Sequence, residues 1–269
     1  SAMNRLDGKV ALISGAARGI GGQTAIRMAE AGAQVIVGDI LEDRAKETVA
    51  QIKAAGGAAE FAFLDVTKES DWSAAVGKAT DIFGGLDILV NNAGIFLGRE
   101  FEEATDADWD KIVAINLKGV YLGTKLCAPA LRARGKTSPH GSAIVNLASI
   151  AGLVGSQLDP IYSMTKGGVT LFTKSTALAF GRKGDRIRVN SIHPGVIDTD
   201  MGAQTFTSRA AQVGSNDVDA AKNQSIKLHP IGRLGVADDI ALGIVFLASD
   251  DAGFMTGSGL VVDGGLTAQ

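Results

Sequence analysis

Two residues with complementary chemistry, Tyr162 and Lys166, stand four positions apart in a stretch that is predicted to open a long helix. Residues at i and i+4 share a helix face, so the phenol and the ammonium can point into one site. A nearby ammonium favours the phenolate and lowers the pKa of a tyrosine, which is ordinarily about 10. Such a pair could take a proton near neutral pH while hydride leaves an alcohol carbon. In isolation the same spacing is more often a solvated helix face, so the prediction depends on the rest of the chain.

The composition is typical of one α/β unit with a sizeable core. The chain has 269 residues, 46% of them apolar, with 35 glycines and only 5 prolines, which suits many tight strand-to-helix turns. A net charge of −3 without a basic block indicates neither a nucleic-acid nor a membrane partner. The single Cys127 and three scattered histidines offer no disulfide and no metal cluster, which favours a cytoplasmic location. No apolar run approaches about 20 residues, and no signal peptide precedes the first strand.

Short β-rich runs alternate with helical runs along the chain. Strands are expected at residues 9–14, 34–38, 59–63, 86–90, 143–147, 187–192 and 260–262. Helices are expected at residues 20–31, 43–55, 69–83, 107–131, 162–180 and 237–248. Gly32, Gly56 and Gly84 stand where they would end the first three helices. Repeated strand–helix–strand units predict an α/β fold with a doubly wound parallel sheet of seven strands and helices on both faces.

One domain is expected over residues 1–269, because no composition break marks a second one. Ser1 and Ala2 look like the remnant of an expression tag and are excluded from the fold. Residues 202–230 interrupt the strand–helix rhythm with a polar segment rich in Ser, Thr and Ala. A segment of this length in a compact fold is more often a lid or binding loop than a passive connection, so we expect a substrate lid there.

The first strand runs into a glycine-rich turn with Gly15, Gly19 and Gly21. These glycines leave room for the backbone to approach a pyrophosphate, and the following helix presents unpaired N–H groups. The spacing of the glycines differs from the common dinucleotide fingerprint. The place of the turn in the series of strands and helices is therefore stronger evidence than the spacing itself. A turn between the first strand and the first helix of an α/β series predicts a dinucleotide site.

Asp39 follows the second strand. A carboxylate there can accept hydrogen bonds from both hydroxyls of the adenosine ribose and would repel a 2′-phosphate, which favours NAD over NADP. A simple helix-capping role for Asp39 is the alternative. Arg18 counts against NAD, because an arginine near the ribose could hold the phosphate.

With these features the chain resembles the short-chain dehydrogenases/reductases over nearly its whole length. The motifs are residues 14–21, Asp65-Val66, Asn91-Asn92-Ala93-Gly94, Asn116, Ser149, Tyr162-x-x-x-Lys166 and Pro194-Gly195. Ser149 lies thirteen residues before Tyr162, at the spacing of the family. Ser14 stands where the family usually has Thr, which keeps a hydroxyl. The resemblance implies a single-domain Rossmann fold and an NAD-dependent oxidoreductase.

The resemblance also implies four catalytic residues. Tyr162 would be the general base in oxidation and the general acid in reduction, and Ser149 would stabilise charge on the substrate oxygen. Lys166 would favour the phenolate and bind the nicotinamide ribose. Asn116 would hold a water molecule that links Lys166 to solvent, although its side chain could instead simply bond to backbone.

Cofactor contacts are implied in the turns after several strands. Asp65 and Val66 would contact the adenine, residues 92–94 the adenine ribose, and Ile197 and Thr199 the nicotinamide carboxamide. The full predicted set is Gly15, Arg18, Gly19, Ile20, Gly21, Asp39, Asp65, Val66, Asn92, Ala93, Gly94, Tyr162, Lys166, Pro194, Gly195, Ile197 and Thr199.

The predicted substrate walls are mostly aliphatic and contain no cationic clamp, which favours an uncharged secondary alcohol or ketone. Cyclic alcohols, hydroxysteroids and aryl-alkyl carbinols fit this description. Arg99 and Arg209 could reach in if the lid folds over, which keeps charged substrates open. The predicted substrate residues are Ser149, Ala151, Leu153, Gln157, Tyr162 and Val196.

Three other functions share some of these motifs. A 3-oxoacyl carrier-protein reductase has all of them but typically prefers NADPH, against which Asp39 and the acidic net charge count. A polyol dehydrogenase would need more polar walls, and a noncatalytic NAD-binding scaffold usually lacks the Tyr or the Lys.

The family resemblance further implies a homotetramer, with one interface built from residues 237–248 and the last strand, and the other from the two long helices at 107–131 and 162–180. A monomer is the alternative.

Overall fold

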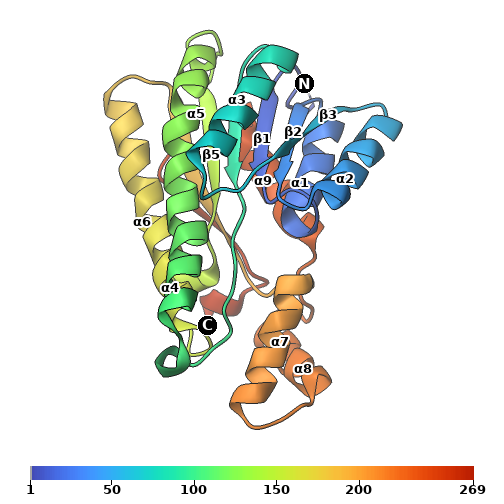
Figure 1. Ribbon diagram of the computed structural model, residues 1–269, viewed down its shortest axis with the longest axis vertical. Coiled ribbons are helices and arrows are strands. Elements are labelled where there is room, and N and C mark those ends of the chain that lie inside the picture. Colours follow the sequence, from blue (N-terminus) through green and yellow to red (C-terminus); the bar gives the residue numbers. More distant parts are fainter. Residues whose placement is uncertain (1) are drawn as a thin grey trace.

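Seven parallel strands form one sheet in the order β3-β2-β1-β4-β5-β6-β7 in the computed structural model, which describes residues 2–269 (Figure 1). This confirms the predicted doubly wound sheet, its strand number and its Rossmann topology. Ser1, predicted to belong to a tag remnant, lies outside the described residues. The strands are β1 (Val10–Ser14), β2 (Gln34–Asp39), β3 (Ala58–Phe63), β4 (Ile88–Asn91), β5 (Ser142–Leu147), β6 (Ile187–Pro194) and β7 (Gly259–Val262).

The central strands are buried along their whole length, as expected for strands covered by helices on both faces. Ala11 and Ile13 of β1 pack into the core on one face of the sheet, and Val10 and Leu12 pack into the core on the other. The first core is covered by α1 (Gly19–Glu30), α2 (Glu42–Ala54) and α9 (Ala237–Ala248). The second core is covered by α3 (Glu69–Phe83), α5 (Gly119–Gly135) and α6 (Pro160–Arg182).

Helix ends follow the expected glycines. Gly32, Gly56 and Gly84 all adopt positive φ angles of 103°, 89° and 88°, a backbone region that side chains disfavour. The order in which the chain adds strands reverses between β1 and β4. The chain first adds β2 and β3 on one side of β1, and then returns to add β4 on the other side. A crevice forms at the carboxyl ends of the strands at such a point.

The helix expected at residues 107–131 is wrong as a single element. It consists of α4 (Asp106–Val113), a π-helical segment η2 (Ala114–Lys118) and α5, which continues to Gly135. A π turn contains one extra residue, and such turns are frequent at functional sites. Asn116 lies in it, and its amide is bonded to the backbone of Ile95 on a separate segment, which gives the local change a tertiary cause.

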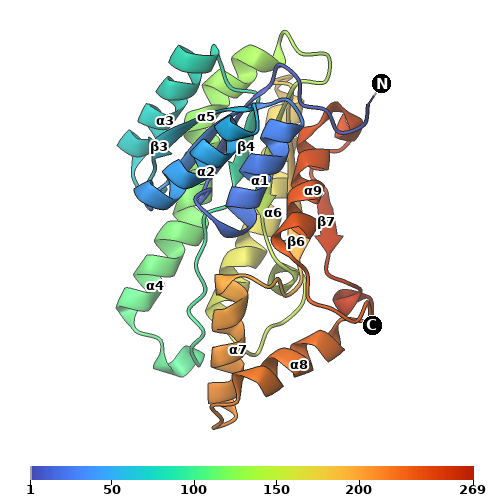
Figure 2. The same cartoon turned by 90° about the vertical axis from the view of Figure 1, so that its right-hand side faces the viewer.

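The polar segment at residues 202–230 is helical and not a loop, and its predicted function as a substrate lid stays a prediction. It contains α7 (Asp200–Gln212), capped by the Thr199 hydroxyl, and α8 (Val218–Leu228), capped by the Asp217 carboxylate. The two helices pack around the apolar side chains of Phe206, Ala210, Ala221 and Leu234. They form a lobe that extends beyond the carboxyl ends of the strands (Figures 1 and 2).

The remaining elements are short. They are the 3₁₀ turns η1 (Phe101–Glu103), η3 (Ile150–Gly152), η4 (Asp250–Ala252) and η5 (Leu266–Ala268). Within residues 2–269, no helix combines the length and the apolar character that crossing a membrane requires.

Candidate active site

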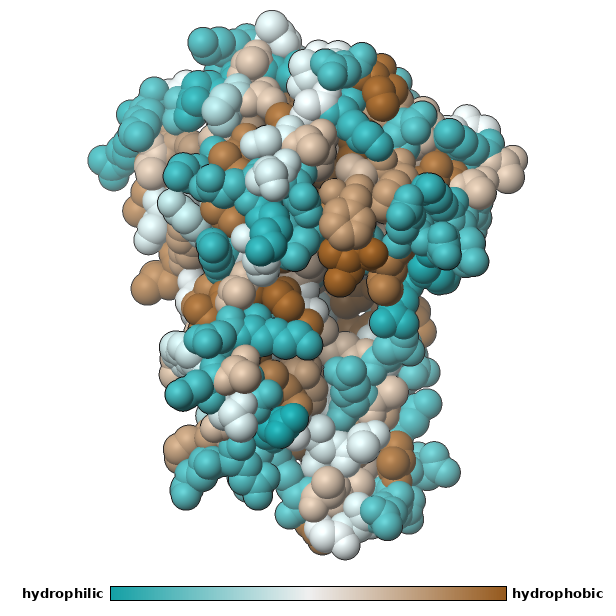
Figure 3. Space-filling view, in the orientation of Figure 1, coloured by the Kyte–Doolittle hydropathy of each residue, from teal (hydrophilic) through white to brown (hydrophobic). Residues whose placement is uncertain are grey.

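A pocket of about 1130 Å³ lies between the carboxyl edge of the sheet and the lobe of α7 and α8. Figure 3 shows the molecule hollowed between these two parts, with hydrophobic side chains on the upper rim of the hollow. Pockets for small ligands usually measure about 300–1,000 Å³. The volume is therefore sufficient for a dinucleotide together with a small substrate.

All but one of the predicted cofactor residues line this pocket. The exception is Gly21, which is buried in α1 behind the glycine-rich turn. A Cβ at Gly21 would collide with the carbonyl oxygen of Gly15, so this glycine allows the turn to close without touching the pocket itself. The structure places Gly21 one layer behind the pocket surface, and its predicted contact with the cofactor stays a prediction.

The turn after β1 forms a cradle that only small residues can build. Gly15 has a φ of +64°, and a Cβ there would lie 3.0 Å from the Cα of Ala93. The Ser14 hydroxyl accepts hydrogen bonds from the backbone N–H groups of Asn92 and Ala93, which ties the turn after β1 to the turn after β4. The Asn92 amide donates back to the Gly15 carbonyl at 3.0 Å.

The start of α1 is open toward the pocket. No side chain caps this helix, so its first N–H groups are free of a capping acceptor. Gly19 lines the pocket with a φ of +61°, and nothing lies within 4 Å of where its Cβ would be. Free N–H groups beside open space suit a phosphate, because the positive end of the helix dipole points there.

Asp39 is the acidic group at the adenosine end of the pocket. One carboxylate oxygen accepts from the N–H of Ala17 at 2.9 Å and the other accepts from the N–H of Leu41 at 3.0 Å. Both bonds fix the orientation of the carboxylate and leave further lone pairs for a ligand. Arg18, which counted against NAD, forms an ion pair with Asp200 at 2.6 Å.

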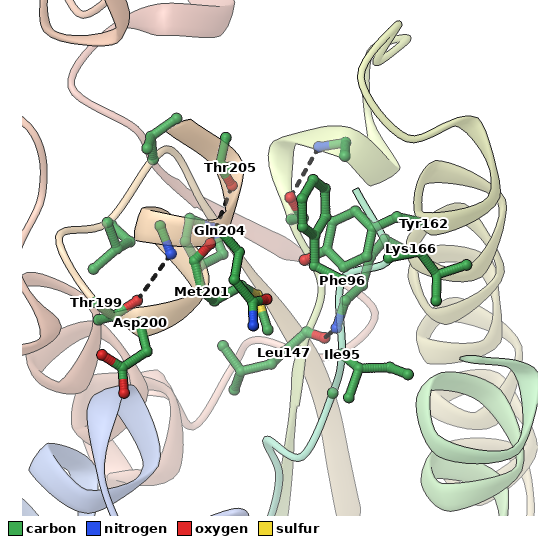
Figure 4. A pocket seen from close by; sticks show the side chains of 18 of the residues that line it. Ile95, Phe96, Leu147, Tyr162, Lys166, Thr199, Asp200, Met201, Gln204 and Thr205 are labelled. Carbon is green, nitrogen blue, oxygen red and sulfur yellow. Dashed lines mark hydrogen bonds between the residues drawn. The ribbon is translucent and has the colours of Figure 1, made fainter. Parts of the chain in front are cut away.

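The predicted catalytic residues come from β5 and α6. Ser149 follows β5, and Tyr162 and Lys166 stand on the first turns of α6, where Pro160 occupies the first helical turn. Tyr162 packs edge-on against Phe96, with ring centroids 5.5 Å apart, and Lys166 Nζ donates to the Leu147 carbonyl at 2.8 Å. Figure 4 shows these side chains on one side of the pocket and Met201, Gln204 and Thr205 of α7 on the other.

Burial controls the ionisation of both groups of the Tyr–Lys pair. It raises the pKa of Tyr162 to about 12, an effect that the Ser149 side chain opposes and the Asp159 charge reinforces. It also lowers the pKa of Lys166 to about 8. The pKa of the phenol is therefore raised and not lowered as predicted, because burial outweighs the support from Lys166 Nζ, which donates to a carbonyl and lies 5.7 Å from the ring centroid of Tyr162.

Asn116 lies behind the pocket instead of lining it. Its side-chain oxygen accepts from the N–H of Ile95 at 2.8 Å, and its amide donates to the Ile95 carbonyl and to the Thr165 hydroxyl. A Cβ on Gly94 would lie 3.4 Å from both Asn116 Oδ1 and Lys166 Nζ. The residue therefore positions the chain after β4 against α6, and its role in holding a water stays a prediction.

On the substrate side, the predicted residues Ser149, Ala151, Gln157, Tyr162 and Val196 line the pocket. Leu153 does not. It is 46% exposed and lies outside the lining, so the structure does not bring it together with the other predicted substrate residues, and its contact with the substrate stays a prediction. The opposite wall is formed by α7, which belongs to the segment that was expected to be a lid and from which Arg209 was expected to reach in.

Asp159 is a positioning residue that sequence reasoning missed. Its buried carboxylate accepts from the backbone N–H groups of Leu97, Gly98 and Tyr162. It therefore joins the segment after β4 to the first turn of α6. The signal was present, since Asp followed by Pro is a common start of a helix.

Two buried histidines have structural partners instead of metal. His193 contacts the Ser191 hydroxyl and the Ser149 carbonyl, and thereby supports the backbone at Ser149. His229 bonds through Nδ1 to the Ser225 carbonyl, and its Nε2 accepts from the N–H of Val196. In the part of the chain that the structure describes, no group of His, Cys, Asp and Glu residues could hold a metal ion.

Fold and site together define the class of this protein. A family model described as enoyl-(acyl carrier protein) reductase matches residues 15–267. The chain belongs to the short-chain dehydrogenase/reductase family, and it is an oxidoreductase of the alcohol dehydrogenase type.

Several relatives with similar sequences act on cyclic alcohols, according to their names. A 2,5-dichloro-2,5-cyclohexadiene-1,4-diol dehydrogenase of Sphingobium indicum is 42% identical, with 97% of each chain covered. A trans-4-hydroxycyclohexanecarboxylate dehydrogenase of Sinomonas cyclohexanicum is 41% identical and covers 98% of this chain and 95% of the relative. A cyclohexanol dehydrogenase of an Acinetobacter species is 41% identical, over 99% and 98% of the two chains.

A solved structure gives the same fold. It is the gluconate 5-dehydrogenase from Burkholderia cenocepacia in complex with NADP and tartrate. Its TM-score is 0.87 at 33% identity, with 99% of this chain and 98% of that chain covered.

Proposed function

We propose that this protein interconverts a cyclic secondary alcohol and its ketone with NAD as the hydride carrier. The observation that carries the proposal is the grouping of Ser149, Tyr162 and Lys166 at one wall of a pocket that also contains the glycine cradle. The names of the relatives support a ring-shaped alcohol. Mostly apolar walls on the β5–α6 side suit the hydrocarbon part of such a ring.

The residues present fit a dinucleotide. The cradle at Gly15 and Gly19, which Gly21 supports from behind, would accept the pyrophosphate, and Asp39 would bind the adenosine ribose. Val66 and Asn92 lie in the pocket for the adenosine half, and Ile197 and Thr199 for the nicotinamide half. When bound, the cofactor supplies the hydride acceptor for oxidation and the donor for reduction.

The preference for NAD is supported by the charges around the ribose site. Asp39 would repel a 2′-phosphate, and the guanidinium of Arg18 is already paired with Asp200. A related structure contains NADP, so the preference has to come from such local residues and not from the fold.

Proton transfer falls to Tyr162. In oxidation its phenolate oxygen takes the proton of the substrate hydroxyl, and in reduction its neutral phenol returns it. The Ser149 hydroxyl donates a hydrogen bond to the substrate oxygen, where negative charge develops. Lys166 is buried at the same wall, and its positive charge below its pKa of about 8 favours the phenolate.

Alcohol oxidation is expected to accelerate as the pH rises from 6 toward 8 and to level off above that. Because burial raises the pKa of Tyr162 to about 12, its ionised fraction grows with pH throughout this range. Lys166 loses its charge above about 8, which removes its support of the phenolate. Ketone reduction uses the neutral phenol, so it should not gain from high pH. Initial rates in buffers of constant ionic strength measure both profiles, and oxidation that slows as the pH rises would contradict this assignment.

A substrate screen tests the function itself. NADH formation is expected with cyclohexanol, cyclopentanol and substituted cyclic alcohols, and much less with linear polyols. Activity confined to acyl thioesters of a carrier protein would favour the carrier-protein reductase, and good turnover of polyols would favour a polyol dehydrogenase. NADH binding without any turnover would indicate a noncatalytic scaffold.

We also propose a homotetramer that works in the cytoplasm. Met164, Leu171 and Leu178 recur every seven residues along α6 and are 57%, 65% and 60% exposed. Such a stripe of large apolar side chains supports an interface on this helix. The single cysteine, Cys127, is buried and unpaired, which suits a reducing compartment.

A further inference from the structure

One face of α7 forms the wall of the pocket that stands opposite Tyr162. Met201, Thr205 and Arg209 line the pocket at intervals of four residues, so they lie on a single face of the helix. At 1.5 Å per residue, Arg209 stands about 12 Å farther along the helix than Met201. Because α7 leads away from the sheet (Figure 1), Arg209 stands farther from the sheet along this helix than Met201 does.

Within residues 2–269, no carboxylate pairs with the guanidinium of Arg209. Its Nε is buried and makes no hydrogen bond within residues 2–269. Burial alone lowers its pKa, since no carboxylate of the described chain is close enough to raise it. By contrast, Arg18 is paired with Asp200 and Arg99 with Asp108. A cation that is partly desolvated and unpaired is costly, so its position calls for an anion.

Neighbouring polar groups cannot supply that anion, because they are already engaged. The C-terminal half of α7 packs against Gly98 through Ser208, and Gln212 donates to the Leu158 carbonyl at 2.9 Å. The Asp159 carboxylate between these segments accepts three backbone N–H groups, as described above. The negatively charged group that pairs with Arg209 must therefore be part of the ligand.

We propose that Arg209 binds a carboxylate of the substrate, on the opposite side of the ring from the hydroxyl that reacts at Tyr162. The substrate class is then a hydroxycycloalkane carboxylate, not a wholly uncharged alcohol. A single planar guanidinium matches a singly charged carboxylate, whereas a phosphate usually needs more than one cation. This inference rests on the proposed function and refines the substrate expected from the sequence.

The names of two relatives fit a selection of this kind. One is named for a ring that carries a carboxylate, trans-4-hydroxycyclohexanecarboxylate, and another for the neutral cyclohexanol. Both are 41% identical to this chain, so overall similarity does not separate the two substrate types. Arg209 favours the substrate type that carries a carboxylate.

The test compares trans-4-hydroxycyclohexanecarboxylate with its carboxamide, which keeps the shape but not the charge. The wild-type protein is expected to have a kcat/KM at least about tenfold higher for the carboxylate. Arg209→Met should lower kcat/KM for the carboxylate by about 10- to 100-fold, mostly through KM, and change that for the carboxamide by less than about threefold. The kcat/KM of Arg209→Lys for the carboxylate should lie between those of the wild type and Arg209→Met, because lysine keeps the positive charge but cannot donate two parallel hydrogen bonds to a carboxylate.

Arg44→Met serves as a matched control, since Arg44 is exposed and paired with Glu47 outside the pocket, and it should behave as wild type. A second measurement needs no variant: cyclohexanecarboxylate should inhibit the wild-type oxidation of cyclohexanol at least about tenfold more tightly than cyclohexanecarboxamide. Equal inhibition by the two compounds, or an unchanged carboxylate preference in Arg209→Met, would overturn the role of Arg209. Turnover of cyclohexanol would still support the proposed function, which fails only if no cyclic alcohol is oxidised.

Discussion

Replacing Tyr162 by Phe is expected to lower kcat for alcohol oxidation by on the order of 10³-fold, because it removes the phenol that we propose takes the substrate proton. The phenyl ring can keep the edge-on contact with Phe96, so the pocket wall should stay intact. Binding of NADH should change by less than about twofold, because the cradle and Asp39 are unaffected. Stopped-flow or steady-state NADH formation measures the first effect, and quenching of protein fluorescence measures the second.

Tyr121→Phe is the natural control, since Tyr121 is the other of the two tyrosines of the chain and is exposed on α5. It should retain wild-type rates. If Tyr162→Phe kept more than about a tenth of the activity, proton transfer would have to be assigned to another group or to water. A loss of NADH binding in the same variant would instead indicate damage to the pocket.

Replacing Asp39 by Ser should shift the ratio of kcat/KM for NAD to that for NADP by about 10- to 100-fold toward NADP. The change removes a negative charge beside the ribose, where a 2′-phosphate would stand, and one to three kcal/mol corresponds to about this factor. It also deprives the N–H groups of Ala17 and Leu41 of their acceptor. We therefore also expect the free energy of unfolding to fall by about 1–3 kcal/mol for each N–H that stays unsatisfied.

Asp198→Ser provides the comparison for Asp39→Ser. Asp198 is an exposed partner of Lys222 outside the pocket, so its loss removes the same charge without touching the ribose site. This variant should keep the cofactor preference of the wild type. A wild-type protein that already used NADP as well as NAD in paired kinetics would contradict the role of Asp39.

The sheet and the dinucleotide cradle were predictable because local sequence determines them. Buried strands are apolar without interruption, and the glycines at 15, 32, 56 and 84 are required by positive φ angles within a few residues of each turn. The π segment around Asn116 was not predictable in this way. It depends on hydrogen bonds between Asn116 and Ile95, which are 21 residues apart, whereas the helical periodicity of the segment continues unbroken.

The site residues that sequence reasoning misjudged all depend on tertiary packing. The segment at residues 202–230 was expected to be a lid or binding loop because it is long and polar, yet its few buried residues suffice for two capped helices. Leu153 and Gln157 stand four residues apart in one segment, yet only Gln157 lines the pocket, and no periodic pattern in this non-helical stretch predicts which of them does. The ionisation of Tyr162 was predicted from its neighbour Lys166, while burial, which sequence does not reveal, has the larger effect.

The division of the pocket between two walls has a consequence for engineering. The groups to which we assign the chemistry stand after β5 and on α6, whereas Met201, Thr205 and Arg209 reach the same space from a helix in a separate lobe with its own small core. We therefore expect substitutions at these three positions to change the substrate preference with little effect on proton transfer. A small combinatorial library restricted to this helix face is therefore an economical route to new ring-oxidising catalysts.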